Sequence, residues 1–213
     1  MNPITKKTLD KSVVEMPKNL TSYLGQKGYT ILKSELTIKQ QTFIKEQLTV
    51  KPYVPGSPVQ LQKSFPAYRE SDKKLYIPRY YGDEIFGPAA QYKLTDGDNI
   101  DLKFAGTLRD YQVPVTQKYL DHVQGGGGGL LELYCAWGKT SSSLYILSQL
   151  AKKTIVIVHK EFLMNQWIER IQQFLPGARI GKIQGQIIDI DNKDIVLCML
   201  QSLVLKEYPS SIF

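Results

Sequence analysis

A short run of residues near the middle of the chain has the composition of a phosphate-binding loop. Gly138, Lys139 and Thr140 follow an apolar stretch at residues 130–134 and open a helical pattern over residues 139–150. Where a strand leads into a turn and the turn opens a helix, free backbone N–H groups and the helix dipole attract an anion. Lys139 would then bind the β- and γ-phosphates of a nucleotide, and the Thr140 hydroxyl would be a ligand of Mg²⁺.

The loop departs from the general pattern G-x-x-x-x-G-K-[ST] at its first position. Leu133 stands where the pattern has glycine, and the glycine run at residues 125–129 lies too far upstream to supply it. A Gly-Lys-Thr triplet alone is weak evidence, because it occurs often by chance. Its context strengthens it, since the apolar run before it, the helix after it and a second apolar run at residues 154–158 give the order of a βαβ unit. The alternative is an exposed Lys-Thr pair at an ordinary helix start.

Hydrophobic periodicity predicts that the second half of the chain, residues 106–213, alternates between helices and strands. The predicted helices cover residues 108–122, 139–150 and 161–174, and the predicted strands cover residues 130–134, 154–158, 179–183 and 195–199. The β-branched run at residues 154–158 is typical of a strand in a parallel sheet that is covered on both faces. We therefore expect an α/β domain with a mostly parallel sheet.

The first half, residues 1–105, is rich in tyrosine, proline and lysine and shows only short strand patterns. Thr37 and Gln40 have the spacing of a capping box that opens a short helix. Strand patterns on both sides of a polar tip at residues 71–74 indicate a β-hairpin. The stretch at residues 82–88 reads as irregular. We expect a small α+β domain.

Composition narrows the class of protein and of partner. Lys and Arg number 27 against 20 Asp and Glu, and the net charge of +7 favours an anionic partner such as nucleic acid. A basic protein without such a partner is the alternative. Cys135 and Cys198 are too few and too far apart for a disulfide framework or a zinc site. No apolar stretch is long enough to cross a bilayer, and the N-terminus lacks a signal core, so we expect an intracellular, soluble protein with no membrane partner.

Several motifs resemble those of superfamily 2 helicases. Leu-Arg-Asp-Tyr-Gln at residues 108–112 resembles the Leu-Arg-x-Tyr-Gln motif of that family. Residues 133–140 are similar to motif I of its XPB-like, type III restriction subunit-like branch, which has leucine at the position of Leu133. Ala136 replaces a glycine of the family, and its methyl group would crowd the loop where backbone approaches phosphate.

Further motifs extend the resemblance along the chain. Residues 156–160, followed by Asn-Gln-Trp at residues 165–167, resemble motif Ia, and residues 194–203 resemble a later strand with its Gln-Ser-Leu turn. Tyr-Ile-Pro-Arg-Tyr-Tyr-Gly at residues 76–82 resembles the front domain of helicases from large nucleocytoplasmic DNA viruses. A viral origin would place the protein in the host cytoplasm or in the virion.

The resemblance implies a partial RecA-like P-loop domain, preceded by an α+β domain that engages the substrate, with ATP and Mg²⁺ as cofactors. Lys139 and Thr140 would act on the phosphates as catalytic residues. The other implied nucleotide contacts are Arg109, Gln112, Cys135, Ala136, Trp137 and Gly138. Gln112 would read adenine through a bidentate hydrogen bond, and the alternative is a solvated side chain on a helix face.

Five residues are candidate nucleic-acid contacts. By resemblance, Lys160, Gln201 and Ser202 would contact the backbone of DNA or RNA, although a basic residue after a strand is usually only solvated. Arg79 and Tyr80 belong to a stretch that interleaves aromatic and basic residues, as surfaces that stack on bases do. Tyrosines in a small domain more often fill the core, which is the alternative.

The motifs favour the N-terminal part of an ATP-dependent superfamily 2 helicase or translocase that couples ATP hydrolysis to strand movement. The family's Asp-Glu-x-His box, motif III and second RecA-like domain are missing before Phe213. We therefore expect the chain alone to hydrolyse ATP poorly. Two alternatives stay open, a non-catalytic nucleic-acid-binding remnant and a small P-loop kinase or other NTPase. The expected partners are DNA or RNA and transcription or replication machinery.

Overall fold

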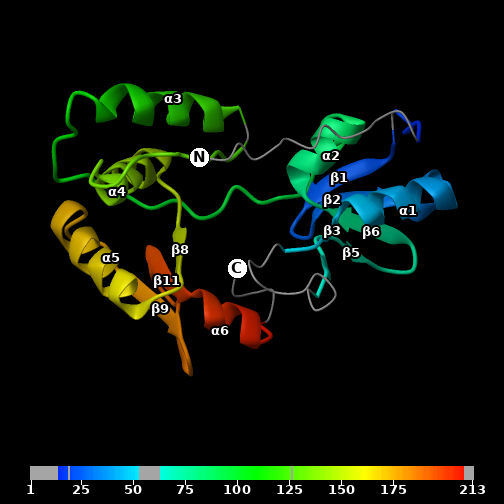
Figure 1. The fold of residues 1–213 in the computed structure, drawn as a ribbon. Coiled ribbons are helices and arrows are strands. Elements are labelled where there is room, and N and C mark those ends of the chain that lie inside the picture. Colours follow the sequence, from blue (N-terminus) through cyan, green and yellow to red (C-terminus); the bar gives the residue numbers. More distant parts are fainter. Residues whose placement is uncertain (1–13, 19, 53–62, 126, 209–213) are drawn as a thin grey trace. The chain divides into compact units, whose positions relative to one another are not determined.

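The computed structural model divides the chain into two compact units, Met1–Thr95 and Asp96–Phe213 (Figure 1). The structure describes residues 14–18, 20–52, 63–125 and 127–208. Each unit has a hydrophobic core of its own. None of the described helices has the length and apolar character needed to cross a bilayer.

The first unit is built on a five-stranded sheet that is mostly antiparallel. Its strands, in spatial order, are β5 (Arg69–Glu70), β6 (Lys74–Ile77), β2 (Gly28–Leu32), β1 (Ser22–Gly25) and β7 (Gln91–Tyr92). Strand β7 runs parallel to β1, and the other pairs are antiparallel. Two shorter strands, β3 (Thr49–Val50) and β4 (Phe65–Pro66), pair with each other. The predicted hairpin is confirmed, because β5 and β6 pair across the polar tip.

A short 3₁₀ turn (Lys33–Glu35) leads into the first helix, α1 (Ile38–Gln47). The predicted capping box is present at its start. The Gln40 N–H donates to Thr37 Oγ1 at 3.2 Å, and the Thr37 N–H donates to Gln40 Oε1 at 2.9 Å. These bonds satisfy backbone groups that an uncapped helix would leave without partners, and they determine where α1 begins.

The second helix, α2 (Arg79–Phe86), shows that the prediction of an irregular stretch at residues 82–88 is wrong for residues 82–86, whereas residues 87 and 88 lie outside any helix or strand. From the sequence, Gly82 would be expected to interrupt a helix, but it lies inside α2. A Cβ at this position would overlap the Tyr29 ring of β2, so glycine allows α2 to pack closely against the sheet.

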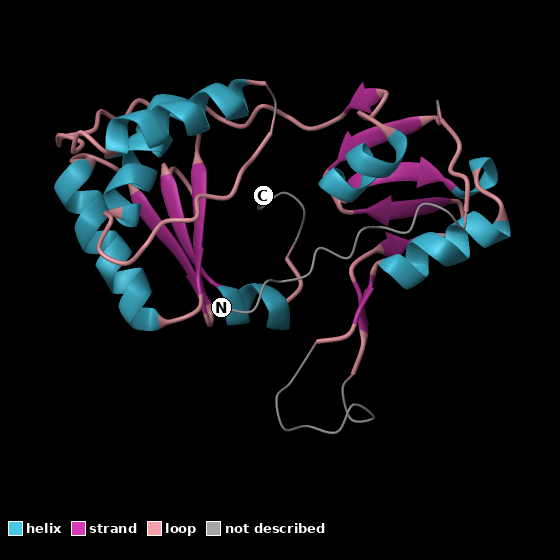
Figure 2. Ribbon diagram, turned by 45° about the horizontal axis from the view of Figure 1, so that its top comes forward, coloured by secondary structure: helices cyan, strands magenta, loops and turns pink. Residues whose placement is uncertain are grey.

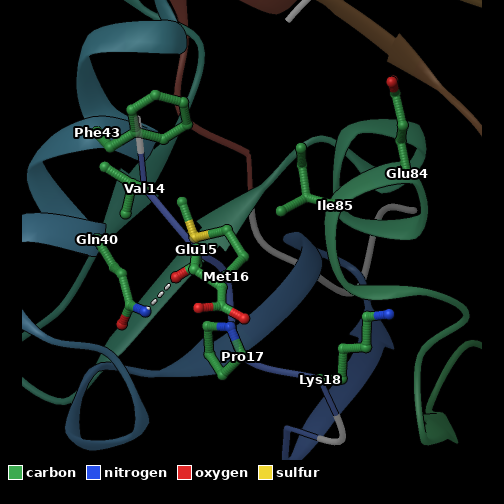
Figure 3. Close-up of a pocket in the computed structure, with 9 residues that line it drawn as sticks. All are labelled: Val14, Glu15, Met16, Pro17, Lys18, Gln40, Phe43, Glu84 and Ile85. Carbon is green, nitrogen blue, oxygen red and sulfur yellow. Dashed lines mark hydrogen bonds between the residues drawn. The ribbon is translucent and has the colours of Figure 1, made fainter. Parts of the chain in front are cut away.

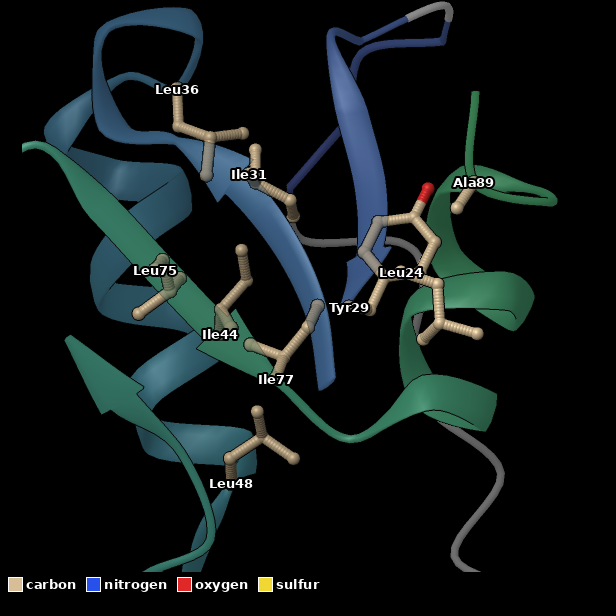
Figure 4. Packing of buried hydrophobic residues seen from close by; sticks show 9 residues of the cluster. All are labelled: Leu24, Tyr29, Ile31, Leu36, Ile44, Leu48, Leu75, Ile77 and Ala89. Carbon is tan, nitrogen blue, oxygen red and sulfur yellow. The ribbon is translucent and has the colours of Figure 1, made fainter. Parts of the chain in front are cut away.

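The core of the first unit lies between one face of the sheet and the two helices (Figure 4). Its buried side chains come from the strands, from α1 and from adjoining segments: Leu24, Tyr29, Ile31, Leu36, Ile44, Leu48, Leu75, Ile77 and Ala89. Tyr81 and Phe86 of α2 pack against the same cluster. The Tyr29 hydroxyl lies 3.1 Å from Ser22 Oγ and 3.0 Å from the Gly87 carbonyl oxygen, so its polar end is satisfied inside the core.

The second unit contains a four-stranded sheet. Its strands, in spatial order, are β10 (Ile187–Asp189), β9 (Ile180–Gln184), β11 (Ile195–Met199) and β8 (Thr154–Val158). Strands β9, β11 and β8 are parallel, which confirms the predicted α/β fold with a mostly parallel sheet. Strand β10 pairs antiparallel with β9 and was not predicted, because so short a strand depends on its partner. The helices are α3 (Gln112–Gln124), α4 (Lys139–Leu150), α5 (Glu161–Phe174) and α6 (Leu200–Leu205).

Helices α4 and α5 cover one face of this sheet (Figure 2). The buried residues of this core are Leu144, Leu147, Val158, Met164, Ile171, Leu175, Ile195 and Leu197. Ile100, Leu102 and Phe104 pack against it, so the segment before α3 belongs with the second unit. The Phe104 ring stacks on Phe174 of α5 with ring centroids 5.3 Å apart.

Strand β8 has one covered and one open side in the described part of the chain. Val156 and Val158 belong to the core under α4 and α5, whereas Ile155 is 42% and Ile157 is 56% exposed. Along its edges β8 pairs with β11 alone among the described strands. The β-branched run therefore forms the predicted strand without the predicted cover on both faces.

The apolar stretch at residues 130–134 is not a strand, contrary to prediction. An apolar sequence becomes a strand only when its backbone groups find partners in a ladder, and no described strand pairs with this stretch. Leu130 is exposed, and Leu131 lines a hollow of about 290 Å³ together with Ile146 and Leu147 of α4. The chain thus reaches the phosphate-binding loop through an irregular segment.

Candidate nucleotide-binding site

The loop before α4 adopts the backbone conformation that opens a helix toward an anion. Gly138 precedes the first helical residue with φ of 94°, a left-handed value that glycine adopts without strain. Ala136 also has a left-handed backbone, with φ of 64°. Because alanine carries a Cβ, this conformation costs about 1–2 kcal/mol that glycine would not. The substitution that the sequence showed at Ala136 is therefore a point of backbone strain.

The start of α4 presents hydrogen-bond donors to the loop. The Ser142 N–H is the first to close the helix, donating to the Gly138 carbonyl oxygen at 3.0 Å, so the preceding N–H groups have no intrahelical acceptor. The Lys139 side chain is exposed and Thr140 is half-buried beside it. Among the described residues, no hydrogen bond or ion pair holds the Lys139 ammonium. Its charge is therefore available to a ligand.

Gln112 fastens the start of α3 to the loop. Its side chain is 3% exposed; Oε1 accepts from the Arg109 N–H at 2.9 Å, and Nε2 donates to the Trp137 carbonyl oxygen at 2.9 Å. Trp137 is itself buried, with its ring centroid 5.6 Å from that of Tyr111. The alternative of a solvated Gln112 is therefore wrong. Its contact with adenine stays a prediction, and the loop-holding contact is one that the sequence did not reveal.

A hollow of about 470 Å³ lies at the loop. It is lined by Arg109, Ala136, Gly138, Lys139, Thr140, Ser141, Gln166, Arg170 and Phe174. The last three come from α5 and were not among the predicted nucleotide contacts. These three residues are spaced four apart and therefore share one face of α5. That spacing is visible in the sequence and is the signal by which they could have been predicted to line one site. Cys135 is exposed and, like Trp137, is not among the lining residues.

The electrostatic character of this hollow favours an anion. It contains the cationic side chains of Arg109, Lys139 and Arg170, and none of its lining residues is acidic. Arg109 Nη1 donates to the Tyr111 hydroxyl at 2.7 Å, and Arg170 Nη1 donates to Gln173 Oε1 at 2.6 Å. In the described structure neither guanidinium forms an ion pair with a carboxylate. A phosphate group would meet three charges that no neighbouring carboxylate offsets.

A larger hollow of about 910 Å³ lies in the first unit (Figure 3). It is lined by residues 14–18 together with residues of α1 and α2, and Gln40 Nε2 donates to the Glu15 carbonyl oxygen across it at 2.7 Å. The described residues that line it include the carboxylates of Glu15 and Glu84 and, as the one cation among them, Lys18. Because those carboxylates repel phosphate, the smaller hollow at the loop is the better nucleotide site.

Three of the candidate nucleic-acid residues are brought together where the parallel strands end. Lys160 is the N-cap residue of α5 just after β8, and it is exposed. Gln201 Nε2 donates to the His159 carbonyl oxygen at 2.9 Å, and Ser202 Oγ accepts from the Gly185 N–H at 2.9 Å. The start of α6 is thereby fixed beside the end of β8, and the roles of these residues stay predictions.

The other two candidates, Arg79 and Tyr80, lie at the start of α2 in the first unit. The Arg79 guanidinium carbon is 5.6 Å from the centroid of the Tyr80 ring, and Arg79 Nε is 3.6 Å from Asp83 Oδ2. Tyr80 is exposed, whereas burial raises the pKa of the neighbouring Tyr81 to about 12. The aromatic stretch therefore divides into an exposed ring and a core ring.

Comparisons with known proteins give one family match and several viral relatives. Residues 105–210 match the family model described as "Type III restriction enzyme, res subunit". A protein of Acanthamoeba polyphaga mimivirus named "Putative ATP-dependent RNA helicase" is 32% identical over 203 residues, which are 93% of this chain and 39% of that protein. A "Putative helicase" of Invertebrate iridescent virus 6 is 32% identical over 100 residues, or 46% of this chain and 23% of that protein.

Among solved structures, "Sulfolobus solfataricus SWI2/SNF2 ATPase core in complex with dsDNA" covers 54% of this chain and 25% of its own, with 22% identity and a TM-score of 0.43. The chain spans about two fifths of the length of the mimivirus relative. The family model covers the loop, α3 to α6 and the parallel sheet. The chain belongs to the superfamily 2 helicases and resembles their viral members.

Proposed function

We propose that the chain binds ATP together with Mg²⁺ at the loop before α4, as part of a helicase or translocase that acts on DNA or RNA. The observation that carries this proposal is the cationic hollow in which Lys139 and Thr140 lie at a helix start, with Arg109 and Arg170 beside them. The membership of the family and the name of the mimivirus relative, an RNA helicase, support the same function.

Each residue of the hollow has a role that its chemistry allows. The free N–H groups of α4 and the Lys139 ammonium would bind the β- and γ-phosphates. The Thr140 hydroxyl fits as one oxygen ligand of Mg²⁺, which neutralises phosphate charge when bound. Because the lining residues include no carboxylate, phosphate oxygens and water would complete the coordination of the ion. Gln112 would keep the loop in place while the nucleotide binds.

We further propose that nucleic acid crosses the ends of the parallel strands, where Lys160, Gln201 and Ser202 lie together. A lysine there would contact phosphate, and amide and hydroxyl groups would hydrogen-bond to the backbone. Because none of the described residues that line the hollow at the loop is a carboxylate, we expect slow hydrolysis by the chain alone. A non-catalytic nucleic-acid-binding protein is the second candidate, supported by the same missing carboxylate and by the net charge of +7.

Binding of a fluorescent ATP analogue in the presence of Mg²⁺ tests the proposal. We expect Lys139→Ala to raise the Kd about ten- to hundredfold, since it removes a charge-assisted hydrogen bond to phosphate. Lys118→Ala is the matched control, because Lys118 is an exposed lysine of α3 outside the hollow. Equal affinities of the two variants would refute the site. ATPase rates with and without DNA or RNA then separate a motor from a non-catalytic binder.

A further inference from the structure

One face of the sheet in the first unit packs into the hydrophobic core, and the other face points away from that core. Leu24, Tyr29, Leu75 and their neighbours point toward α1 and α2. Because side chains alternate along a strand, the residues between them point to the other face. On that face the register places one residue from each strand in a continuous row, in the order Arg69, Tyr76, Thr30, Tyr23 and Gln91. The row thus crosses all five strands.

Two tyrosines dominate this row. Thr30 lies between Tyr23 and Tyr76 and is only 1% exposed, whereas both tyrosines are half-buried. The two rings stand two strand spacings apart, roughly 10 Å. A sheet face that carries two partly exposed rings and a small residue between them offers flat surfaces for stacking.

Four cationic side chains surround these rings. Lys27 Nζ lies 5.2 Å from the centroid of the Tyr76 ring, and Lys93 Nζ lies 4.2 Å from that of Tyr23. Lys74 Nζ is 5.3 Å from the Tyr23 centroid and 3.2 Å from its hydroxyl oxygen, a hydrogen bond that lowers the pKa of that hydroxyl. In the described residues none of Lys27, Lys74, Lys93 and Arg69 pairs with a carboxylate.

No acidic residue occupies this face within the strands. Glu70, the one acidic residue of the five strands, lies in register with the core residue Leu75 and forms ion pairs with Lys33 and with Lys45 of α1 at 2.7 Å each. The carboxylate is thus on the opposite side. The row of rings therefore carries positive charge that is not offset, which favours an anionic ligand.

A hollow of about 240 Å³ adjoins the Tyr76 ring. It is lined by Lys27, Gly28, Pro66, Ala67, Tyr68, Arg69, Tyr76, Ile77 and Pro78. The rings of Tyr68 and Tyr76 and the cationic side chains of Lys27 and Arg69 thus line one concave site. This combination suits a flat aromatic group that is linked to a phosphate.

We propose that this tyrosine face, defined by Tyr23, Tyr76, Lys27, Arg69, Lys74 and Lys93, binds single-stranded nucleic acid. Bases stack on the two rings, and the cations contact phosphates along the row. Rings roughly 10 Å apart can stack only on bases that are unpaired and splayed, so a single strand fits better than a duplex. The inference rests on the proposed function in taking nucleic acid as the partner, but it needs neither ATP nor the loop before α4.

The structure also separates this face from the aromatic stretch that the sequence suggested. Of Tyr76, Tyr80 and Tyr81, Tyr76 alone is in the row, because β6 ends at Ile77 and α2 begins at Arg79. Tyr23 comes from a strand more than fifty residues earlier and meets Tyr76 across β2. The partner of Tyr76 is therefore set by strand pairing and is not visible as a local motif.

Fluorescence anisotropy with labelled oligo-deoxythymidine and oligo-uridine, without nucleotide, tests the proposal on the whole chain. We expect Tyr76→Ala to weaken binding about five- to hundredfold and Tyr76→Phe, which keeps the ring, to bind like the parent chain. The matched control is Tyr92→Ala, because Tyr92 is 59% exposed on the same sheet but in register with the core residue Leu24.

A second variant does not touch the sheet. Lys27 lies in the turn between β1 and β2, so Lys27→Ala leaves the strands intact, and it should reduce the slope of log affinity against log salt by about 0.7. Lys39→Ala, an exposed lysine of α1, should leave the slope unchanged.

The outcomes distinguish this inference from the proposed function. Parent-like binding by both Tyr76→Ala and Lys27→Ala, or equal affinity for duplex through the same residues, would overturn the tyrosine face. If those variants lose the single strand while the chain fails to bind ATP, the face stands and the nucleotide proposal falls. If Lys139→Ala loses ATP binding while the Tyr76 and Lys27 variants still bind single-stranded nucleic acid, the nucleotide proposal stands and the tyrosine face falls.

Discussion

Replacing Ala136 by glycine should change both the stability of the chain and its affinity for nucleotide, and the change in stability comes from the left-handed backbone of Ala136 inside the loop. Its φ of 64° costs an L-residue with a Cβ about 1–2 kcal/mol. Glycine removes that cost but makes the unfolded chain more flexible, which lowers stability by about 0.4–1 kcal/mol. The free energy of unfolding should therefore rise by about 0.8 kcal/mol, the difference between the middles of the two ranges.

The effect on affinity has a separate origin. Ala136 lines the hollow at the loop, so its methyl group occupies space where backbone would approach phosphate. If the glycine variant allows one more hydrogen bond to phosphate, of about 1 kcal/mol, the Kd for ATP falls about fivefold. Isothermal titration with ATP and Mg²⁺ measures this change, and urea unfolding measures the stability.

Ala151 provides the control for this experiment. It follows α4 with φ of 51°, so it has the same backbone strain but lies at the other end of the helix, away from the hollow. Ala151→Gly should stabilise the chain to a similar extent and leave the affinity for ATP unchanged. An unchanged or weaker affinity of Ala136→Gly, or the same gain in both variants, would refute the argument that the methyl group crowds the phosphate.

Three further predictions concern stability. Gln112→Ala should lower the free energy of unfolding by about 1–3 kcal/mol, because it leaves the buried Trp137 carbonyl group and the partly buried Arg109 N–H without their partner; Gln117→Ala, on the exposed side of α3, should change it little, and tryptophan fluorescence in urea measures both. The Arg179 guanidinium beside Asp194 lowers the pKa of that carboxyl group, so the ion pair stabilises the fold above the ordinary Asp pKa of about 3.9 and is lost as the pH falls through the lowered value. Thermal unfolding of Asp194→Asn should therefore show less loss of stability between neutral and acidic pH than the parent chain, and parallel profiles would contradict this. Gly82→Ala should destabilise the first unit by about 1–3 kcal/mol, since the added methyl meets a core ring, and an unchanged unfolding midpoint would show that α2 can shift freely.

Local signals in the sequence were sufficient where a few neighbouring residues determine the structure. The capping box at Thr37 predicted the start of α1, because both of its hydrogen bonds are made within four residues. The β-branched run before His159 predicted β8 and its parallel sheet. Lys139 and Thr140 were predicted from a local motif, and the structure places them at the start of α4 beside a hollow, while their binding of phosphate stays a prediction.

Signals that depend on distant partners were beyond the sequence. Gly82 was misread because glycine marks a break in most contexts, and its reason for being in α2 is the Tyr29 ring from another strand. Arg170 and Phe174 line the hollow at the loop only through the packing of α5 beside α4. The row that joins Tyr23 to Tyr76 likewise exists only once β2 lies between them.

The open side of β8 has a practical consequence for the purified protein. Among the described strands, one edge of β8 has no partner, and an uncharged strand of β-branched residues with such an edge is a template on which other extended chains add by backbone hydrogen bonding. The exposed side chains of Ile155 and Ile157 add an apolar surface to this edge. The strand contains no charged residue and no proline, the residues that usually prevent the addition of further strands. We therefore expect concentration-dependent aggregation to begin at β8. Covering this strand, or replacing its exposed side chains by charged ones, should reduce that aggregation.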